Sequence, residues 1–274
     1  MSNKKRMQRT SRYIRARWPV YFGLYSALIG LIMFIGLSMA VGWYSFVPFS
    51  LAIILVVSYL LTALVYVAYR INDAPGGSAA EILFDLAQTR PEDKVVCLDL
   101  GLRETAVVIA QHLTTGEVTV VDLYNPQSNT NASLHRSREQ VGKPPMDPRL
   151  NWIDGSVNLL PLPDRSVSAV YMNQILSEFW IPEERDQLLE EARRILAPEG
   201  RLLVAEPVRA QTNLLLAGLV TYFLPSQDHW MNTLTEAGFT IRRQENARGL
   251  LYCVRADKPS PTAGKQLHLK LEYI

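Results

Sequence analysis

The chain has 274 residues, of which 48% are hydrophobic and 20% charged, with a net charge of +2. This composition excludes an intrinsically disordered protein, and two cysteines in such a length exclude a disulfide-stapled scaffold. The charges are unevenly spread: residues 1–17 carry seven Lys or Arg and no acid, whereas residues 71–274 hold 20 basic against 26 acidic residues. Duplex recognition requires a basic face, so the mildly acidic body predicts no nucleic-acid partner.

Residues 18–70 have the composition of a membrane module. From Trp18 to Tyr69 there is no charged residue and no histidine, and one bilayer crossing takes about 20 apolar residues. We expect two transmembrane helices at about 19–41 and 48–69, joined by a turn that contains a glycine, a proline and interfacial aromatics. A cleaved signal peptide, with its small-residue site at Ser38-Met39-Ala40, is the alternative.

The charge asymmetry predicts an orientation for this hairpin. Seven basic residues precede the first helix and none lies in the turn, so the basic segment 1–17 is expected on the cytoplasmic side. Two spans return the chain to that side, so we expect both termini to be cytoplasmic. The protein is then expected to be an integral membrane protein whose partner is the lipid bilayer. Residues 71–77 are rich in turn formers and predict a linker.

The segment 78–257 alternates between short apolar runs and amphipathic stretches, which predicts an α/β domain. Ser78 and Glu81 have the spacing of a capping box and open a helix that runs to about Gln88. The expected strands are 94–100, 117–123, 150–153, 166–172, 201–205, 239–242 and 250–255, and the further helices are 104–113, 132–141, 182–196 and 230–237. These elements predict a doubly wound, Rossmann-like, mainly parallel seven-stranded sheet, followed by a tail at 258–274 that is either an edge strand or disordered.

Acidic side chains follow the first two strands of this sheet. Ligands of doubly wound sheets bind beyond the carboxyl ends of the strands, and an acid after the second strand suits a ribose diol. Asp99 and Asp122 occupy these positions, although an aspartate at a strand end is also a common cap or turn residue. Four scattered histidines and two distant cysteines have no metal-ligand spacing, so we expect no metal.

Four segments between about 80 and 256 resemble one enzyme family in their order and sequence. They are Asp99-Leu100-Gly101, the run from Gly155 to Asp164, the run from Ala192 to Pro207, and Glu236-Ala237-Gly238-Phe239. Together they resemble class I S-adenosylmethionine-dependent methyltransferases, in the broad group that includes the ubiquinone and menaquinone C-methyltransferases. The resemblance implies S-adenosylmethionine as the cofactor.

The resemblance also implies roles for individual residues. Asp99 and Gly101 would lie beside the methionine part of the cofactor, Asp122 at the ribose, Ser156 at the adenine and Asn173 at the floor of the site. Two positions depart from the family pattern: Arg103 and Thr105 replace glycines of the turn, and Ser156 replaces an acid. Arg103 is therefore expected either to pair with the cofactor carboxylate or to fill the site.

No general base can be chosen from the spacing of residues. The candidates by residue type are Tyr171, Asn173, Glu178, Tyr222 and His229. The apolar segment 213–224 is too short to span a bilayer and is expected either to cover the substrate mouth facing the membrane or to be an ordinary core or lid helix.

The sequence thus predicts a membrane-anchored methyltransferase that acts on a hydrophobic small molecule or lipid at the cytoplasmic membrane face. The altered turn favours a rival hypothesis, a non-catalytic domain that keeps the fold for binding or scaffolding. Methylation of a protein partner remains a third possibility.

Overall fold

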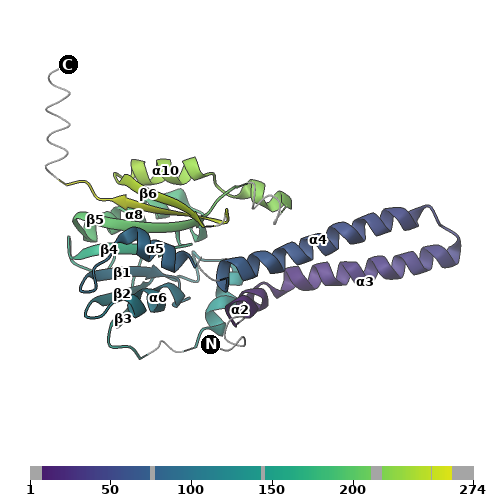
Figure 1. The fold of residues 1–274 in the computed structure, drawn as a ribbon, viewed down its shortest axis with the longest axis horizontal. Coiled ribbons are helices and arrows are strands. Elements are labelled where there is room, and N and C mark those ends of the chain that lie inside the picture. The colour runs from purple at the N-terminus through teal and green to yellow at the C-terminus, as the bar shows by residue number, and fades with distance from the viewer. Residues whose placement is uncertain (1–7, 75–77, 143–145, 211–217, 248, 261–274) are drawn as a thin grey trace, which may run out of the picture.

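An antiparallel pair of long helices projects from a compact α/β domain (Figure 1). The computed structural model describes residues 8–74, 78–142, 146–210, 218–247 and 249–260. The pair consists of α3 (Trp18–Val41) and α4 (Phe46–Asn72). Gly42 caps the end of helix α3. Its backbone is left-handed (φ 84°), and its N–H donates to the carbonyl of Met39.

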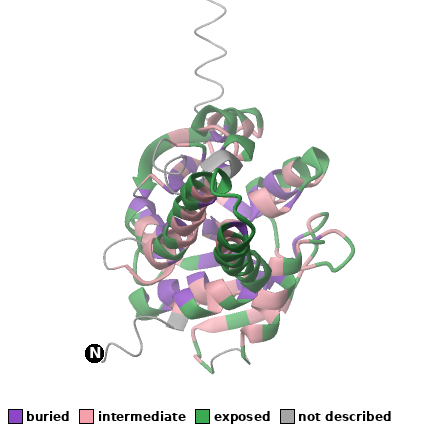
Figure 2. Cartoon of the chain, turned by 90° about the vertical axis from the view of Figure 1, so that its right-hand side faces the viewer, coloured by how far each residue is buried: buried purple, intermediate pink, exposed green. Residues whose placement is uncertain are grey.

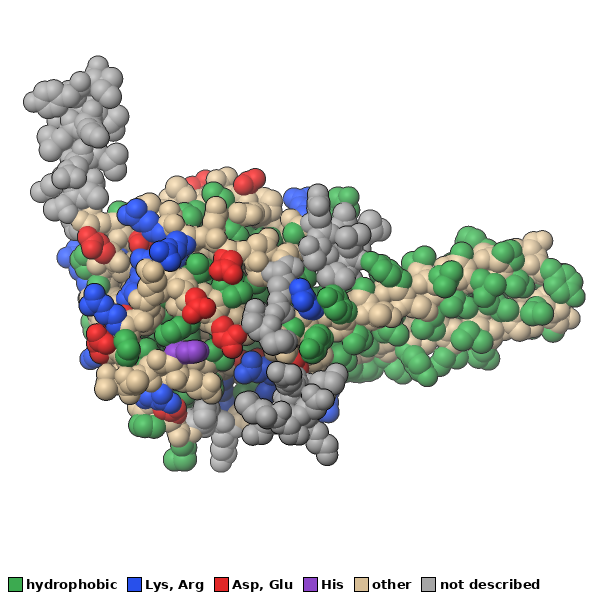
Figure 3. All heavy atoms as spheres, viewed as in Figure 1, with side chains coloured by type: hydrophobic (Ala, Val, Ile, Leu, Met, Phe, Trp, Pro, Cys, Tyr) green, Lys and Arg blue, Asp and Glu red, His purple; other side chains and the backbone are tan. Residues whose placement is uncertain are grey.

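The helix pair carries its apolar side chains on the outside. Both helices are long and apolar enough to cross a membrane by length and composition, and only 6% of the most apolar stretch of α3 and 11% of that of α4 is buried. Figure 2 shows these helices mostly exposed, with buried residues concentrated in the domain behind them. In Figure 3 hydrophobic side chains line the projecting pair.

A short helix that the sequence did not predict precedes the pair. Helix α2 (Gln8–Ala16) belongs to the basic segment, for which only a cytoplasmic location was expected. It folds back onto the base of the pair, where the backbone N–H of Thr10 donates to Asp73 Oδ2 at 2.8 Å. It also packs on α7 (Ala132–Gln140), so the N-terminal segment forms part of the domain surface.

The sheet has seven strands in the order β3-β2-β1-β4-β5-β7-β6. Strands β1 to β5 pair with one another in parallel. Strand β7 is antiparallel to both of its neighbours, β5 and β6. Their bounds are Lys94–Asp99 for β1, Glu117–Asp122 for β2, Leu150–Asp154 for β3, Val167–Asn173 for β4, Leu196–Pro207 for β5, Thr240–Ala247 for β6 and Leu251–Asp257 for β7. This is the predicted doubly wound, mainly parallel sheet.

Helices cover both faces of the sheet because successive strand residues point to opposite sides. Leu98 packs with the residues of α8 and α10 on one face, and Cys97 packs with those of α5 and α6 on the other. The bounds are Ala79–Ala87 for α5, Glu104–His112 for α6, Pro182–Ile195 for α8 and Gln227–Glu236 for α10, with short 3₁₀ helices at Leu176–Glu178 (η1) and Gly218–Phe223 (η2). The predicted cap of α5 is present, since Ser78 Oγ accepts from the N–H of Glu81 at 3.2 Å.

Several element ends differ from the sequence prediction. Strand β5 begins at Leu196 rather than Arg201, because Leu196 already pairs with Val167 before the register shifts to Arg201. Helix α10 begins three residues early because Ser226 Oγ caps it, accepting from the N–H of His229 at 3.1 Å. The run 267–271 that could have added an edge strand lies outside the described residues, as do 213–217 of the expected lid.

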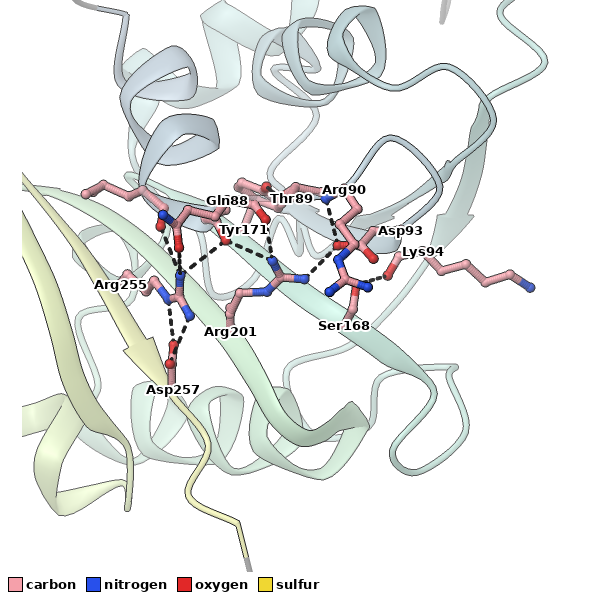
Figure 4. A network of polar contacts seen from close by, with 12 residues as sticks. Gln88, Thr89, Arg90, Asp93, Lys94, Ser168, Tyr171, Arg201, Arg255 and Asp257 are labelled. Carbon is pink, nitrogen blue, oxygen red and sulfur yellow. Dashed lines mark hydrogen bonds and ion pairs between the residues drawn. The ribbon is translucent and has the colours of Figure 1, made fainter.

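An arginine network ties α5 to the amino ends of the parallel strands (Figure 4). Arg201 donates to the carbonyls of Ala87 and Gln88 at 2.9 Å each and pairs with Asp93 at 2.6 Å. The hydroxyl of Tyr171 lies 2.5 Å from that of Thr89 in the same network. These contacts supply acceptors at the end of α5 with donors that the helix itself lacks.

Candidate functional site at the carboxyl edge of the sheet

Three predicted site residues meet where β1, β2 and β4 end. Asp99 and Asp122 are direct neighbours in the β1–β2 register. Asn173 ends β4, whose Met172 is paired with Leu98 of β1, so Asn173 lies on the other side of Asp99. Parallel strands thus bring two carboxylates and one amide to a single edge, as the sequence predicted.

The turn between β1 and α6 has left-handed backbone at Arg103, one of the two positions at which the family pattern has a glycine, whereas Thr105 lies within α6. Gly101 has φ 82° and Arg103 has φ 65°, so both adopt the left-handed conformation. The N–H of Arg103 donates to Asp99 Oδ2 at 2.8 Å. Left-handed backbone costs a non-glycine residue about 1–2 kcal/mol, and this hydrogen bond offsets part of that cost.

Asp99 is a buried acid with an altered pKa. Its residue is 6% exposed. Burial and, to a lesser extent, the nearby Asp122 charge raise the pKa of its carboxyl to about 6 despite the backbone hydrogen bond from Arg103. The carboxylate is therefore costly to ionise, which is typical of acids held in a functional site.

Arg103 does not fill the site, contrary to one of the two expectations. Its guanidinium donates to the carbonyl of Gly142 and lies 5.7 Å from the centre of the Trp152 ring.

A different arginine occupies the edge. Arg138 of α7 donates from one terminal nitrogen to both carboxylate oxygens of Asp122, at 2.8 and 2.9 Å, and to the carbonyl of Leu100 at 2.6 Å. Its guanidinium carbon lies 4.1 Å from the centre of the Tyr124 ring. A Cβ added to Gly101 would lie only 1.9 Å from the guanidinium, so Arg138 fills the space that this glycine leaves open.

A cavity of about 140 Å³ lies beside these groups. Asp99, Thr105, Asn173 and Glu178 line its domain wall. Asn173 donates from Nδ2 to Thr105 Oγ1 at 2.9 Å, and its buried Oδ1 has no partner within the described part of the chain. Thr105, one of the two glycine replacements, therefore orients the amide of a residue that lines the cavity.

Glu178 is the acidic candidate base that reaches this cavity. Its Oε2 accepts from Asn131 Nδ2 at 3.0 Å, and burial raises the pKa of the carboxyl while that hydrogen bond and Arg17 lower it. Glu206 supports the loop that carries it. The Glu206 carboxylate is 0% exposed and accepts from the N–H groups of Leu176 and Ser177 at 2.7 and 3.3 Å.

The remaining candidates do not line the cavity. Ser156 follows β3, whose Asp154 is paired with Asp122, so it lies at the same edge of the sheet. Ser156 is exposed, and its hydroxyl accepts from the N–H of Asn158 at 3.3 Å. Tyr171 belongs to the arginine network at the opposite edge, where burial raises its pKa to about 12, so it is not a base for this site. His229 and Tyr222 are exposed and do not line the cavity.

The opposite wall of the cavity comes from the N-terminal module, which consists of α2 and the helix pair α3 and α4. The sequence did not predict that this module would contribute to the site. Arg9, Tyr13 and Arg17 of the α2 region and Ile71 and Asn72 at the end of α4 line it. Arg12 pairs with Glu104 at 3.2 Å and fastens α2 to the start of α6. The sequence signals for this segment are its basic charge and the helical spacing of its arginines.

Comparisons with known proteins agree with this architecture. Residues 98–204 match a family described as a methyltransferase domain. A SAM-dependent methyltransferase from Aquifex aeolicus is similar over 68% of this chain and 94% of its own, with 17% identity and a TM-score of 0.53. A SAM-dependent methyltransferase from Methanosarcina mazei is similar over 65% of this chain and 97% of its own, with 16% identity and a TM-score of 0.48.

A further similar structure is geranyl diphosphate C-methyltransferase from Streptomyces coelicolor. The similarity covers 65% of this chain and 78% of that enzyme, with 15% identity and a TM-score of 0.47. Among the residues that the structure describes, no group of three or more His, Cys, Asp or Glu is placed to hold a metal ion. The sheet order and the likeness to the Aquifex aeolicus structure show that the domain that follows the helix pair has the Rossmann-like methyltransferase fold.

Proposed function

We propose that this protein is a membrane-anchored, S-adenosylmethionine-dependent methyltransferase that acts on a hydrophobic small molecule or lipid at the membrane surface. One observation carries the proposal: the cavity beside Asp99 and Asn173 is walled on its other side by the N-terminal module. An acceptor that enters from a bilayer at the base of the helix pair would arrive directly at the carboxyl edge of the sheet.

The edge offers suitable groups for S-adenosylmethionine. Asp122 would accept from the ribose hydroxyls, and Gly101 lacks the Cβ that would block close approach of a ligand. Arg138 now fills that approach, so the groups fit the cofactor once this side chain moves. The Aquifex neighbour is named as SAM-dependent, and the adenine role of exposed Ser156 remains a prediction.

Bound S-adenosylmethionine would supply a methyl group on its sulfonium sulfur. Transfer of that methyl group needs a nucleophile aligned with the carbon–sulfur bond that breaks. The residues of this chain would align the acceptor and receive its proton. Asn173 presents a free Oδ1 to hold a polar acceptor group. Glu178 would take the proton, because burial raises its pKa toward the range in which a carboxylate is an effective base.

The helix pair supports a membrane location. Large apolar side chains such as Phe22 (61% exposed), Met33 (70%) and Leu55 (72%) face outward, which a core helix of a soluble domain would bury. Cleavage after Ala40 would remove α2, and with it the part of the cavity wall formed by Arg9, Tyr13 and Arg17 and the pairing of Arg12 with Glu104. This dependence argues for a retained anchor, with the domain on the cytoplasmic side that the basic segment predicts.

The 3₁₀ helix η2 supports a lipid acceptor. It is the described part of the predicted lid, and it lies on the side of the domain from which the helix pair projects (Figure 1). Tyr222 and Phe223 are 57% and 88% exposed there, and aromatic side chains suit the membrane interface. Phe223→Asp should therefore reduce transfer to a lipid acceptor while leaving cofactor binding unchanged.

The rival function, a non-catalytic binding domain, is favoured by Arg138 on Asp122. A methyl-transfer assay separates the two. The full chain in lipid vesicles is incubated with methyl-labelled S-adenosylmethionine and a membrane lipid extract, and label in the lipid fraction is counted. Wild-type chain should label a lipid, whereas Asp122→Ala and Glu178→Gln should not; Arg242→Ala, at an exposed position on β6 that does not line the cavity, is the control.

Absence of label with wild-type chain across membrane extracts, despite measurable cofactor binding, would contradict the catalytic proposal and favour the rival. Label that appears only in protein would instead support methylation of a protein partner.

A further inference from the structure

Arg138 makes contacts at this edge that a bound cofactor would also need. Both carboxylate oxygens of Asp122 accept from the same guanidinium nitrogen, which also reaches the Leu100 carbonyl. The guanidinium further covers Gly101. The side chains of Arg138 and Asp122 are 25% and 23% exposed, so water screens this pair only in part.

A ribose diol and this guanidinium cannot occupy the Asp122 carboxylate in the same way. Each would use the same acceptor oxygens, and the space above Gly101 is too small for both, because a single added carbon there would lie 1.9 Å from Arg138. The neighbouring cavity, about 140 Å³, is also smaller than the roughly 300 Å³ at which ordinary ligand sites begin. Cofactor binding therefore requires Arg138 to leave.

We propose that Arg138 is an internal competing ligand of the cofactor site and that it sets the affinity for S-adenosylmethionine. This inference rests on the proposed function, and it adds a residue from outside the family motif as a determinant of that affinity. Because Arg138 is displaced on binding, its contacts with Asp122 and Leu100 are lost each time the cofactor enters.

The N-terminal helix holds Arg138 in this position. Arg136, two residues away on α7, donates from Nε to the carbonyl of Ala16 at 2.5 Å, where α2 ends. Ser133, Leu134 and Ser137 of α7 line the same cavity as Tyr13 of α2. Movement of α7 away from Asp122 would break these contacts, and α2 leads into the first long helix through Arg17. Cofactor affinity is thereby coupled to the segment at the base of the anchor.

The test is a calorimetric titration of the full chain, in detergent micelles, with S-adenosylmethionine and separately with S-adenosylhomocysteine. Arg138→Ala should bind both ligands at least about tenfold more tightly than wild type, because the variant has no arginine contact with Asp122 to break. A tenfold change in affinity corresponds to the loss of about one charge-assisted hydrogen bond. Arg136→Ala should tighten binding less, by a few fold, since it loosens α7 but leaves Arg138 in place.

Two controls exclude a general effect of charge. Arg242→Ala removes the same charge from a side chain that is 60% exposed on β6, and it should leave both affinities unchanged. S-adenosylhomocysteine lacks the sulfonium charge, so an equal gain for both ligands identifies competition at the ribose rather than repulsion between cations. Unfolding midpoints of all variants establish that each is folded.

The outcomes distinguish the inference from the function on which it rests. Wild-type binding that Arg138→Ala leaves unchanged or weakens would overturn the inference alone, and would make Arg138 a supporting partner of Asp122. An Arg136→Ala affinity equal to wild type would overturn the role assigned to α2. If neither wild type nor Arg138→Ala binds either ligand, the proposed function fails, and the inference fails with it.

Discussion

Glu206 gives a quantitative prediction for stability against pH. Its carboxyl is fully buried beneath η1, and burial raises its pKa to about 7, against 4.5 for an unperturbed glutamate, despite the hydrogen bonds from Ser177 and Leu176 that lower it. Between these two pH values the folded chain keeps the proton and the unfolded chain loses it. Folding is therefore favoured below about pH 4.5, and this contribution is lost as the pH rises to about 7.

The size of the loss follows from the difference between the two pKa values. Each pKa unit is worth about 1.36 kcal/mol, so the interval from 4.5 to about 7 gives a loss of about 3 kcal/mol from Glu206 alone. Glu206→Gln removes the titration and keeps an oxygen that can accept from Leu176. The difference in unfolding free energy between the variant and wild type should shift by about 3 kcal/mol in favour of the variant from pH 4.5 to 7.5.

Urea unfolding of the full chain in detergent, followed by tryptophan fluorescence, measures this difference. Glu206→Ala is the matched control: it also abolishes the titration, but it leaves the N–H groups of Leu176 and Ser177 without their acceptor at every pH. A Glu206→Gln variant whose stability follows the same pH curve as wild type would refute the reasoning.

Three further changes test the fold and the edge. Asp99→Asn should remove the part of the stability loss between about pH 4 and 6 that Asp99 contributes, because the pKa of Asp99 is raised to about 6; pH-dependent urea midpoints, compared with those of wild type, measure it. Ser78→Ala should cost about 1 kcal/mol through the lost cap of α5, as a lower unfolding midpoint. Arg201→Ala should cost about 2–4 kcal/mol, because it removes the ion-pair partner of Asp93 and takes one donor from each of two carbonyls at the end of α5; urea unfolding measures it, and a loss below 1 kcal/mol would contradict the structural role.

The sequence was sufficient to predict the sheet and its acidic edge, because local patterns encode both. Apolar runs of strand length, each followed by turn residues, placed β1 and β2, and parallel pairing alone then makes Asp99 and Asp122 neighbours. The cap of α5 followed equally from the local spacing of Ser78 and Glu81.

The occupant of that edge could not be predicted in this way. Helix α7 is largely polar, and Leu134 is its one buried residue, so its sequence does not reveal which face meets the domain. Arg138 reaches Asp122 because of the path of residues 123–131 and the contact of α7 with α2, both of which are tertiary. The helical form of α2 was missed although Arg9, Arg12 and Arg15 recur at the three-residue spacing of one helix face. The elements that this helix packs against, α4 and α7, are set by tertiary structure.

The most direct test of the account is the affinity of the full Arg138→Ala chain for S-adenosylmethionine, measured with and without a second substitution, Asp122→Ala. In this background the Asp122 carboxylate has no internal arginine partner, so its whole contribution to ligand binding is measured. The account predicts saturable binding that Asp122→Ala weakens about tenfold or more. Equal affinities, or no saturable binding by either chain, would contradict the claim that this edge of the sheet is a cofactor site.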